Sequence, residues 1–348
     1  MSSKSTLLPE NDQQPKEPSQ HQFEMPAHKG TTKKWIKFAV RASVTSLLFA
    51  FLLKSVSWST LLTTLAHAQH TWQLMGLAIG ALCIVFSSFE WHCLVLAEDI
   101  HTDLAHLIKL YLVGIAFSHF LPSSMGGDVT KAFYVGRDSG NMAGATSSVM
   151  LSRITGFLGM LLIALPSLLI WHSWFASEVI VEFLLLSLLL IVLISGTMII
   201  SVCLPKASSR LLKSRWIPKG AVITAAELGQ TLTCAIRKPR SLTIAILFGM
   251  LFWIASFLNY YGYAVALGIH VPLFFYAIAI PFSSLVAFLP ISINGFGVRE
   301  GALVYVFATI HVSPSSSLLL AFLMDTQVLL FGVIGGCIYL TMGNHIKH

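Results

Sequence analysis

Charged side chains are scarce in this sequence: they make up 11% of its 348 residues, whereas hydrophobic side chains make up 55%. Soluble globular domains carry about 25% charged residues, so this composition excludes an ordinary soluble protein. Apolar stretches of about 20 residues, long enough to cross a bilayer, recur along the chain. They are continuous rather than alternating, which excludes a membrane β-barrel. We therefore predict an all-α polytopic integral membrane protein, whose helices satisfy their own backbone groups in lipid.

Motifs for metals, nucleotides and covalent catalysis are also absent. The 5 cysteines form no CxxC pair, so neither a disulfide framework nor a zinc site is expected. No pair of histidines stands in an HExxH motif, and Gly126-Gly127-Asp128 lacks the rest of a P-loop. The GxSxG element of α/β-hydrolases is missing too. We therefore expect no cofactor, no metal and no enzymatic activity.

The apolar stretches divide the chain. Residues 1–34 are polar and are predicted to form a disordered cytoplasmic tail, residues 35–341 a helical membrane domain, and residues 342–348 a short C-terminal tail. Shorter apolar stretches broken by proline and glycine are expected to form re-entrant hairpins at 107–140 and 272–311. The expected membrane spans are 35–53, 72–97, 145–171, 179–204, 241–268 and 315–341.

Positive charge is concentrated in one segment. Residues 205–240 contain eight lysines and arginines against a single glutamate. The positive-inside rule makes this segment a basic cytoplasmic loop, and it places the N-terminus on the same side because of Lys33, Lys34, Lys37 and Arg41. Counting spans from there puts the C-terminus inside as well. We expect a multi-pass protein of the bacterial inner membrane, whose basic loop contacts anionic lipid headgroups rather than nucleic acid. The oligomeric state is left open.

One unusual peptide occurs twice. Residues 120–128 and 288–297 both contain Phe-Leu-Pro, followed by serine and glycine, and charged residues come next. In each copy we expect the proline to end the entering helix, and the glycines to permit positive φ angles and close backbone approach. The topology makes the two hairpins enter from opposite sides, which is the pattern of an inverted-topology repeat in secondary transporters. Chance recurrence in a chain rich in Leu, Phe and Ser is the alternative.

The two broken segments also carry candidate binding groups. We expect helices to restart near Val129 and Val298, where free N–H groups and the positive end of the helix dipole suit an anionic headgroup. Lys131 and Arg299 add positive charge there. The alternative is that these charges lie at the membrane interface and only anchor the hairpins. The candidate substrate-binding residues are Gly126, Gly127, Asp128, Lys131, Arg153, Asn294, Gly295, Gly297, Arg299 and Glu300.

Three ionisable residues interrupt the predicted spans. Arg153 follows a serine-rich stretch and lies farthest from an end to which it could snorkel. Glu90 lies near the cytoplasmic end of its span, so snorkelling is its alternative. Asp325 lies in the last span and is expected to neutralise Arg299 or Arg153. Ionisable groups at membrane depth are costly and mark sites or pathways, so Glu90 and Asp325 are candidate buried polar residues.

At these motifs the sequence resembles the lysylphosphatidylglycerol synthase transmembrane region, also called the flippase-like domain family. The resemblance covers roughly residues 35–341. The family usually has arginine where Lys131 stands, and often a Thr-Pro pair near residues 292–294. The resemblance rests on Pro122-x-x-x-Gly126-Gly127-Asp128-x-x-Lys131, on Arg153, on Leu289-Pro290 and on Gly295-x-Gly297-Val298-Arg299-Glu300-Gly301.

The resemblance implies an inner-membrane protein that moves a lipid or lipid-linked molecule between leaflets. Larger members of the family carry a soluble aminoacyl-transferase domain after the membrane part. None follows the last predicted span, so we expect this chain not to make aminoacylated lipid. Our leading hypothesis is a flippase-like transporter of a lipid with an anionic headgroup. The alternatives are a non-catalytic membrane partner of a lipid-synthesis enzyme, a membrane-embedded lipid transferase, and a small-solute transporter.

Overall fold

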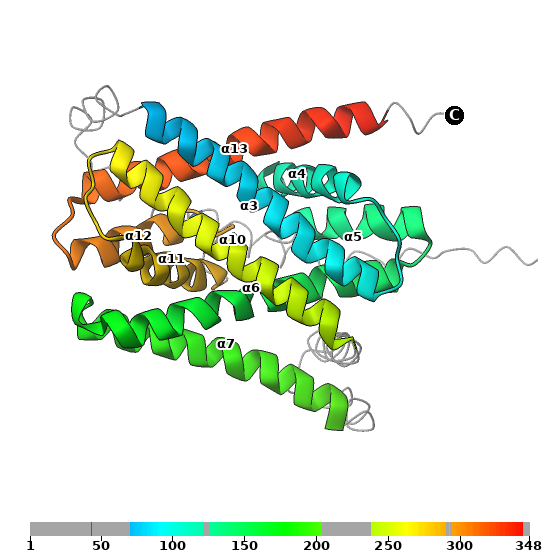
Figure 1. Ribbon diagram of the computed structural model, residues 1–348, viewed down its shortest axis with the longest axis horizontal. Coiled ribbons are helices and arrows are strands. Elements are labelled where there is room, and N and C mark those ends of the chain that lie inside the picture. Colours follow the sequence, from blue (N-terminus) through cyan, green and yellow to red (C-terminus); the bar gives the residue numbers. More distant parts are fainter. Residues whose placement is uncertain are drawn as a thin grey trace, which may run out of the picture.

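The computed structural model describes residues 70–120, 126–203, 238–289 and 294–343, together with residues 43 and 292 (Figure 1). Every regular element in these ranges is helical, which confirms the all-α prediction. The expected tail 1–34, the span 35–53 apart from residue 43, the basic loop before residue 238 and residues 344–348 lie outside the described residues. The helices are α3 (His70–Ala97), α4 (Leu104–Phe120), α5 (Gly126–Ser139), α6 (Met142–Trp171), η1 (His172–Trp174), α7 (Ser177–Cys203), α10 (Pro239–Ala266), α11 (Leu273–Phe288), α12 (Val298–Ala308) and α13 (Pro314–Gly343).

Five of the described helices, α3, α6, α7, α10 and α13, are long and apolar enough to cross a bilayer. Their bounds lie within a few residues of the expected spans. The shorter apolar helices α4 and α11 fall in the stretches expected to be broken. Each is followed by a second short helix, α5 or α12. The chain is therefore a multi-pass helical membrane protein in which each broken stretch forms a pair of short helices.

The helices pack in a pattern that recurs between the two halves of the chain. α3 packs along α10 over much of its length (Figure 1). α13 packs on α4, and α6 packs on α11. The second short helix of each pair also has corresponding neighbours: α5 contacts α4 and α6, and α12 contacts α11 and α13. The order long helix, broken pair, long helix thus occurs at α3 to α6 and again at α10 to α13, with α7 between them.

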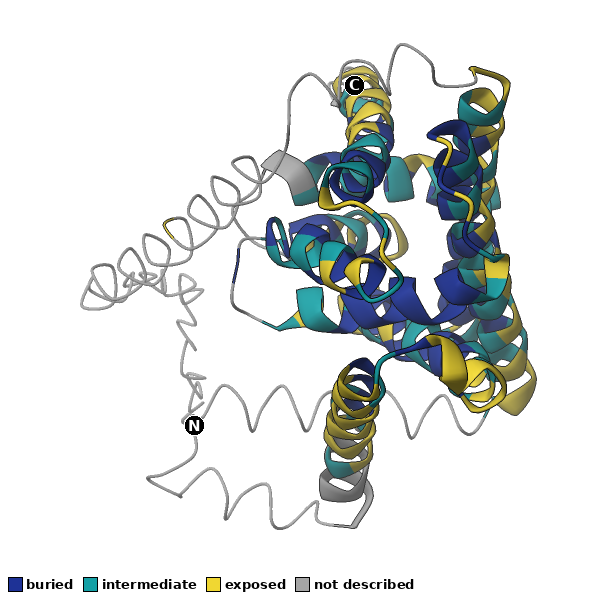
Figure 2. Cartoon of the chain, turned by 90° about the vertical axis from the view of Figure 1, so that its left-hand side faces the viewer, coloured by how far each residue is buried: buried dark blue, intermediate teal, exposed yellow. Residues whose placement is uncertain are grey.

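The side chains between the packed helices are buried, and those on the outer faces are exposed (Figure 2). A large core surrounds α11, where Phe275 and Tyr276 are fully buried. A smaller core forms around Trp91, where α3, α4, α5 and α6 meet. In contrast, the outer faces of α7 and α13 expose large apolar side chains such as Leu185 and Leu340. Apolar outer faces of this kind are suited to contact with acyl chains in a bilayer.

The second break is a left-handed turn. α11 ends shortly before Pro290, a residue that cannot continue a helix without losing a hydrogen bond. Asn294, Gly295 and Gly297 then have φ angles of 52°, 77° and 81°, a region that glycine adopts without strain. α12 begins directly after them, as predicted. Pro122 and Pro290 themselves lie outside the described residues.

The start of α5, which follows the first break, is shaped by close packing instead. α5 begins at Gly126 rather than near Val129, so Gly126 and Gly127 are helical, and of the two features expected of the glycines Gly127 shows the close backbone approach and not a positive φ. A Cβ atom on Gly127 would overlap the carbonyl oxygen of Gly114 and the hydroxyl of Ser118 in α4. Glycine is required here because the backbone of α5 touches α4, not because the chain turns left-handed.

A buried amide network joins three long helices. Gln327 of α13 donates to the carbonyl oxygen of Gly76 in α3 at 3.0 Å. Its own carbonyl oxygen accepts from the Asn259 amide of α10 at 2.9 Å. Both amide side chains are buried, so each hydrogen bond replaces one that water would otherwise make.

Gln327→Leu is expected to lower the free energy of unfolding by about 1–3 kcal/mol, because the buried Asn259 amide loses its acceptor. Thermal unfolding in detergent micelles tests this. The matched control is Thr326→Val on the same helix, since the exposed Thr326 hydroxyl donates only to the Phe322 carbonyl of its own helix. Equal losses in the two variants would contradict the prediction.

A polar contact ties the end of α3 to the start of α10. Lys238 donates to the Ala97 carbonyl at 2.6 Å and to the Asp99 carboxylate at 2.8 Å. This hydrogen bond and the charge of Lys238 hold the pKa of Asp99 below its usual range. Lys238 belongs to the predicted basic loop, so the described end of that loop lies beside the end of α3.

Candidate functional site

The start of α5 gathers two basic residues around one carboxylate. Asp128 Oδ1 lies 3.0 Å from Lys131 Nζ, one turn further along α5. Arg153 of α6 pairs with Asp128 Oδ2. The Lys131 ammonium also lies over the rings of Tyr111 and Trp91, 4.7 and 5.5 Å from their centroids. A carboxylate and two aromatic faces therefore hold Lys131 in place.

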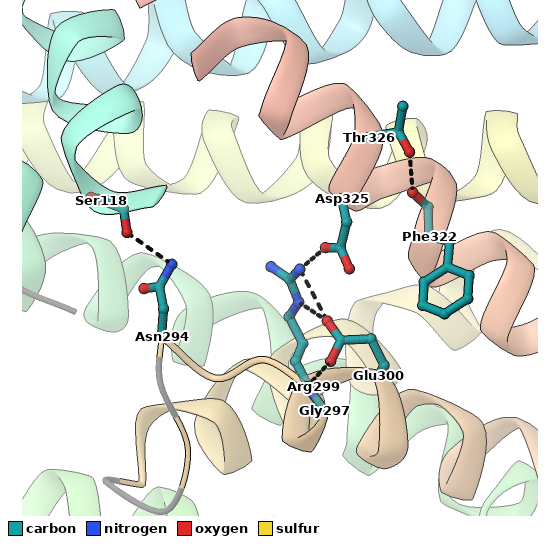
Figure 3. Close-up of polar contacts among 8 residues, drawn as sticks. All are labelled: Ser118, Asn294, Gly297, Arg299, Glu300, Phe322, Asp325 and Thr326. Atoms are coloured by element: carbon teal, nitrogen blue, oxygen red, sulfur yellow. Dashed lines mark hydrogen bonds and ion pairs between the residues drawn. The ribbon is translucent and has the colours of Figure 1, made fainter. Parts of the chain in front are cut away.

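The start of α12 builds a second cluster (Figure 3). Arg299 Nη2 lies 3.3 Å from Glu300 Oε1 and also pairs with Asp325 of α13. Glu300 is 1% exposed, and its other carboxylate oxygen accepts the backbone N–H of Gly297. An internal carboxylate thus occupies part of the helix N-terminus that we expected to face a headgroup.

Asn294 of the second break lies next to the end of α4. Its Nδ2 lies 3.5 Å from the carbonyl oxygen of Ser118 near the end of α4 (Figure 3). A first cavity of about 260 Å³ lies at this junction, between residues far apart in the sequence. It is lined by Tyr111, Gly114, Ile115, Ser118, Gly127, Asp128, Lys131, Asn294, Phe296, Arg299 and Val328.

A second cavity of about 230 Å³ adjoins the first. The two share Tyr111, Asp128 and Lys131 as lining residues. The second cavity extends toward α3, α6 and α10, and it contains the Arg153 side of the first cluster. It is lined by Ser87, Glu90, Tyr111, Asp128, Lys131, Ser152, Arg153, Gly156, Phe157, Phe252 and Trp253.

Residues 36–336, which include both clusters and both cavities, match the protein family described as the lysylphosphatidylglycerol synthase TM region. The chain belongs to this family. It is also similar to a UPF0104 membrane protein of Methanothermobacter thermautotrophicus, with 22% identity over 269 residues that span 73% of this chain and 80% of that protein. No solved structure matches the chain.

In this family member, the two candidate buried polar residues have different surroundings. Glu90 is 4% exposed, faces the second cavity and accepts the Thr155 hydroxyl at 2.6 Å. Its carboxylate therefore does not snorkel to an interface. Asp325 pairs with Arg299, one of its two expected partners, whereas Arg153 pairs with Asp128.

The structure separates the predicted site residues into two groups. Most of them line the cavities, and the rest shape the breaks. Those lining the two cavities are Gly127, Asp128, Lys131, Arg153, Asn294 and Arg299. Those not lining either cavity are Gly126, Gly295, Gly297 and Glu300.

The prediction missed the aromatic part of the site. Trp91 and Tyr111 face Lys131, and Phe296 and Trp253 line the cavities. Tyr111 and Trp253 stand in apolar runs of the sequence, where an aromatic side chain that faces lipid cannot be told from one that lines a cavity. The available signal was the position of Trp91 directly after the ionisable Glu90.

The basic residues of the candidate site pair with carboxylates of the same chain. Lys131 and Arg153 share Asp128, and Arg299 contacts two carboxylates. A buried charge that loses its partner costs several kcal/mol. In the first cluster Asp128 alone faces two cations, so an external anion can pair with one of them while Asp128 stays paired with the other.

Proposed function

We propose that this chain moves the anionic headgroup of a membrane lipid, or of a lipid-linked molecule, between the two leaflets of the inner membrane. The observation that carries the proposal is the meeting of two broken helices around adjoining cavities lined by Lys131, Arg153 and Arg299. Paired broken helices are typical of transport sites. Basic groups inside a membrane bundle form strong, charge-assisted hydrogen bonds with phosphate.

The internal carboxylates support a carrier mechanism. A carrier must return across its cycle without cargo, and three unpaired cations inside the membrane would oppose that return. Asp128 and Asp325 take the place of the phosphate in the empty state, since each already pairs with a cation of the site. Cargo binding then pairs the phosphate with Arg153 and leaves Asp128 paired with Lys131, so no charge of this cluster is left without a partner.

The packing pattern supports an inverted repeat. Each contact of α4 or α5 with its neighbours has a counterpart at α11 or α12. We propose that the two hairpins are re-entrant, enter from opposite faces and meet near the midplane, as in secondary transporters. The positive-inside rule places both termini in the cytoplasm in this arrangement.

The proposal assigns no catalytic step and no cofactor to the chain. A second candidate, favoured by the eight basic residues between 205 and 240, is a non-catalytic partner of a lipid-synthesis enzyme. Deleting residues 208–234 distinguishes the two. A transporter whose site lies in the helical bundle should retain most of its activity, whereas a partner that acts through the basic loop should lose its function.

Leaflet exchange in liposomes tests the proposed function. The purified protein is reconstituted with headgroup-labelled anionic phospholipid, and an impermeant quencher reports the labelled lipid that reaches the outer leaflet. We expect exchange that is faster than in protein-free liposomes. No acceleration for anionic, zwitterionic or glycosylated lipids, with the protein folded, would contradict the proposal.

A further inference from the structure

A third cavity lies on the other side of the first cluster. It has a volume of about 270 Å³ and runs between α5 and α6. Apolar side chains form most of its lining, including Val129 and Phe133 of α5 and Met142 and Met150 of α6. The hydroxyl of Thr146 also lines it, but that hydroxyl donates to the Met142 carbonyl of its own helix. The cavity therefore presents an apolar surface with no unsatisfied polar group at Thr146.

This third cavity opens at the outer surface of the bundle. Val129 is 65% exposed and Phe133 is 49% exposed. α5 belongs to the first broken pair and packs on the membrane span α6, so apolar side chains exposed beside α6 are suited to contact with acyl chains. We call this third cavity the α5–α6 groove.

One ion pair separates the α5–α6 groove from the polar cavities. Asp128 and Arg153 line the groove and also line the second cavity. A path from the surface inward therefore passes first through the apolar α5–α6 groove, then past the Asp128–Arg153 ion pair, and then into the polar second cavity. Its chemistry changes from apolar to cationic at Arg153, whose side chain is 40% exposed.

We infer that the α5–α6 groove binds one acyl chain of the transported lipid while the phosphate of the same molecule takes the place of Asp128 on Arg153. This inference rests on the proposed function, and it makes the groove the lateral entrance of the site. Only an amphiphile with an apolar chain joined to an anionic group matches both sides of the ion pair. Free phosphate would leave the groove empty, and an apolar helix would bring no anion to Arg153.

Groove filling tests the entrance role. Met150→Trp should slow the exchange of long-chain phosphatidylglycerol about tenfold, the effect of excluding roughly two methylene groups. Leu185→Trp places the same ring on the exposed face of α7 and should leave the rate unchanged. Unchanged exchange in folded Met150→Trp protein would overturn the inference. Equal slowing in Met150→Trp and Leu185→Trp would also overturn the inference, because the effect would then not depend on the groove.

Photolabelling tests occupancy separately from transport. Phosphatidylglycerol with a photoactivatable acyl chain should label Phe133, Met142 or Met150, and excess unlabelled phosphatidylglycerol should remove that labelling. Labelling of α7 should not be removed, because it reports bulk lipid. If the wild type exchanges lipid but unlabelled phosphatidylglycerol removes no labelling from the α5–α6 groove, acyl-chain binding in the groove is wrong and the proposed function stands. Competable groove labelling without exchange would overturn both the proposed function and the entrance role, leaving a lipid-binding groove.

Discussion

Arg299→Ala should abolish leaflet exchange, lowering its rate about 100-fold or more. The arginine lines the first cavity and carries the cation of the second cluster. Losing one member of a desolvated charge pair costs about 2–5 kcal/mol, and each ~1.4 kcal/mol is a factor of ten. The same change leaves Glu300 and Asp325 facing each other without a cation, so the thermal unfolding temperature in detergent should also fall.

A double variant separates transport from folding. Arg299→Ala/Asp325→Ala removes the uncompensated carboxylate of α13 and should recover much of the lost thermal stability. It should not recover exchange, because the cation that binds the headgroup is still missing. Arg240→Ala, an exposed basic residue at the start of α10, is the control for the loss of one positive charge. Normal exchange in Arg299→Ala would show that Arg299 only anchors the second hairpin.

Gly335→Ala should destabilise the protein by about 3 kcal/mol or more, at the upper end of overpacking effects. A Cβ atom on Gly335 would overlap the carbonyl group of Leu112 in the backbone of α4. Backbone atoms cannot move aside as a flexible side chain can, so α4 and α13 would have to separate. Thermal unfolding in detergent measures the loss.

The neighbouring Gly336 provides the control. A Cβ atom there meets nothing within 4 Å, so Gly336→Ala should be neutral or stabilise α13 by up to about 1 kcal/mol through helix propensity. Because α4 also carries Tyr111 and Gly114 of the first cavity, Gly335→Ala should slow exchange as well. Similar unfolding temperatures for the two variants would contradict close packing of α4 on α13.

The helices could be predicted from local information. A bilayer-spanning helix needs a continuous apolar run, and a run is visible without knowing its neighbours. The breaks were visible for the same reason, since proline and glycine act on their own backbone. Gly126 and Gly127 show the limit: the sequence marks them as unusual, but whether glycine turns the chain or admits a neighbouring helix depends on what lies opposite.

The candidate site could be predicted only in part. Arg153 stands out because charges at membrane depth are costly, and Asp128 and Arg299 stand out because they follow the two copies of the repeated peptide. The sequence did not predict which of these charges pair, because it allowed Asp325 to neutralise either Arg299 or Arg153. The aromatic faces around Lys131 were missed, since nothing local separates a ring facing a cation from a ring facing lipid.

The sequence by itself determined the membrane class, the helices and the two interrupted segments, because hydropathy and backbone chemistry act along the chain. The tertiary structure decided which carboxylate neutralises which cation, how two segments far apart in sequence share one cavity, and where an apolar groove meets Arg153. Those features depend on distances between helices, which are set when side chains from separate elements pack against one another.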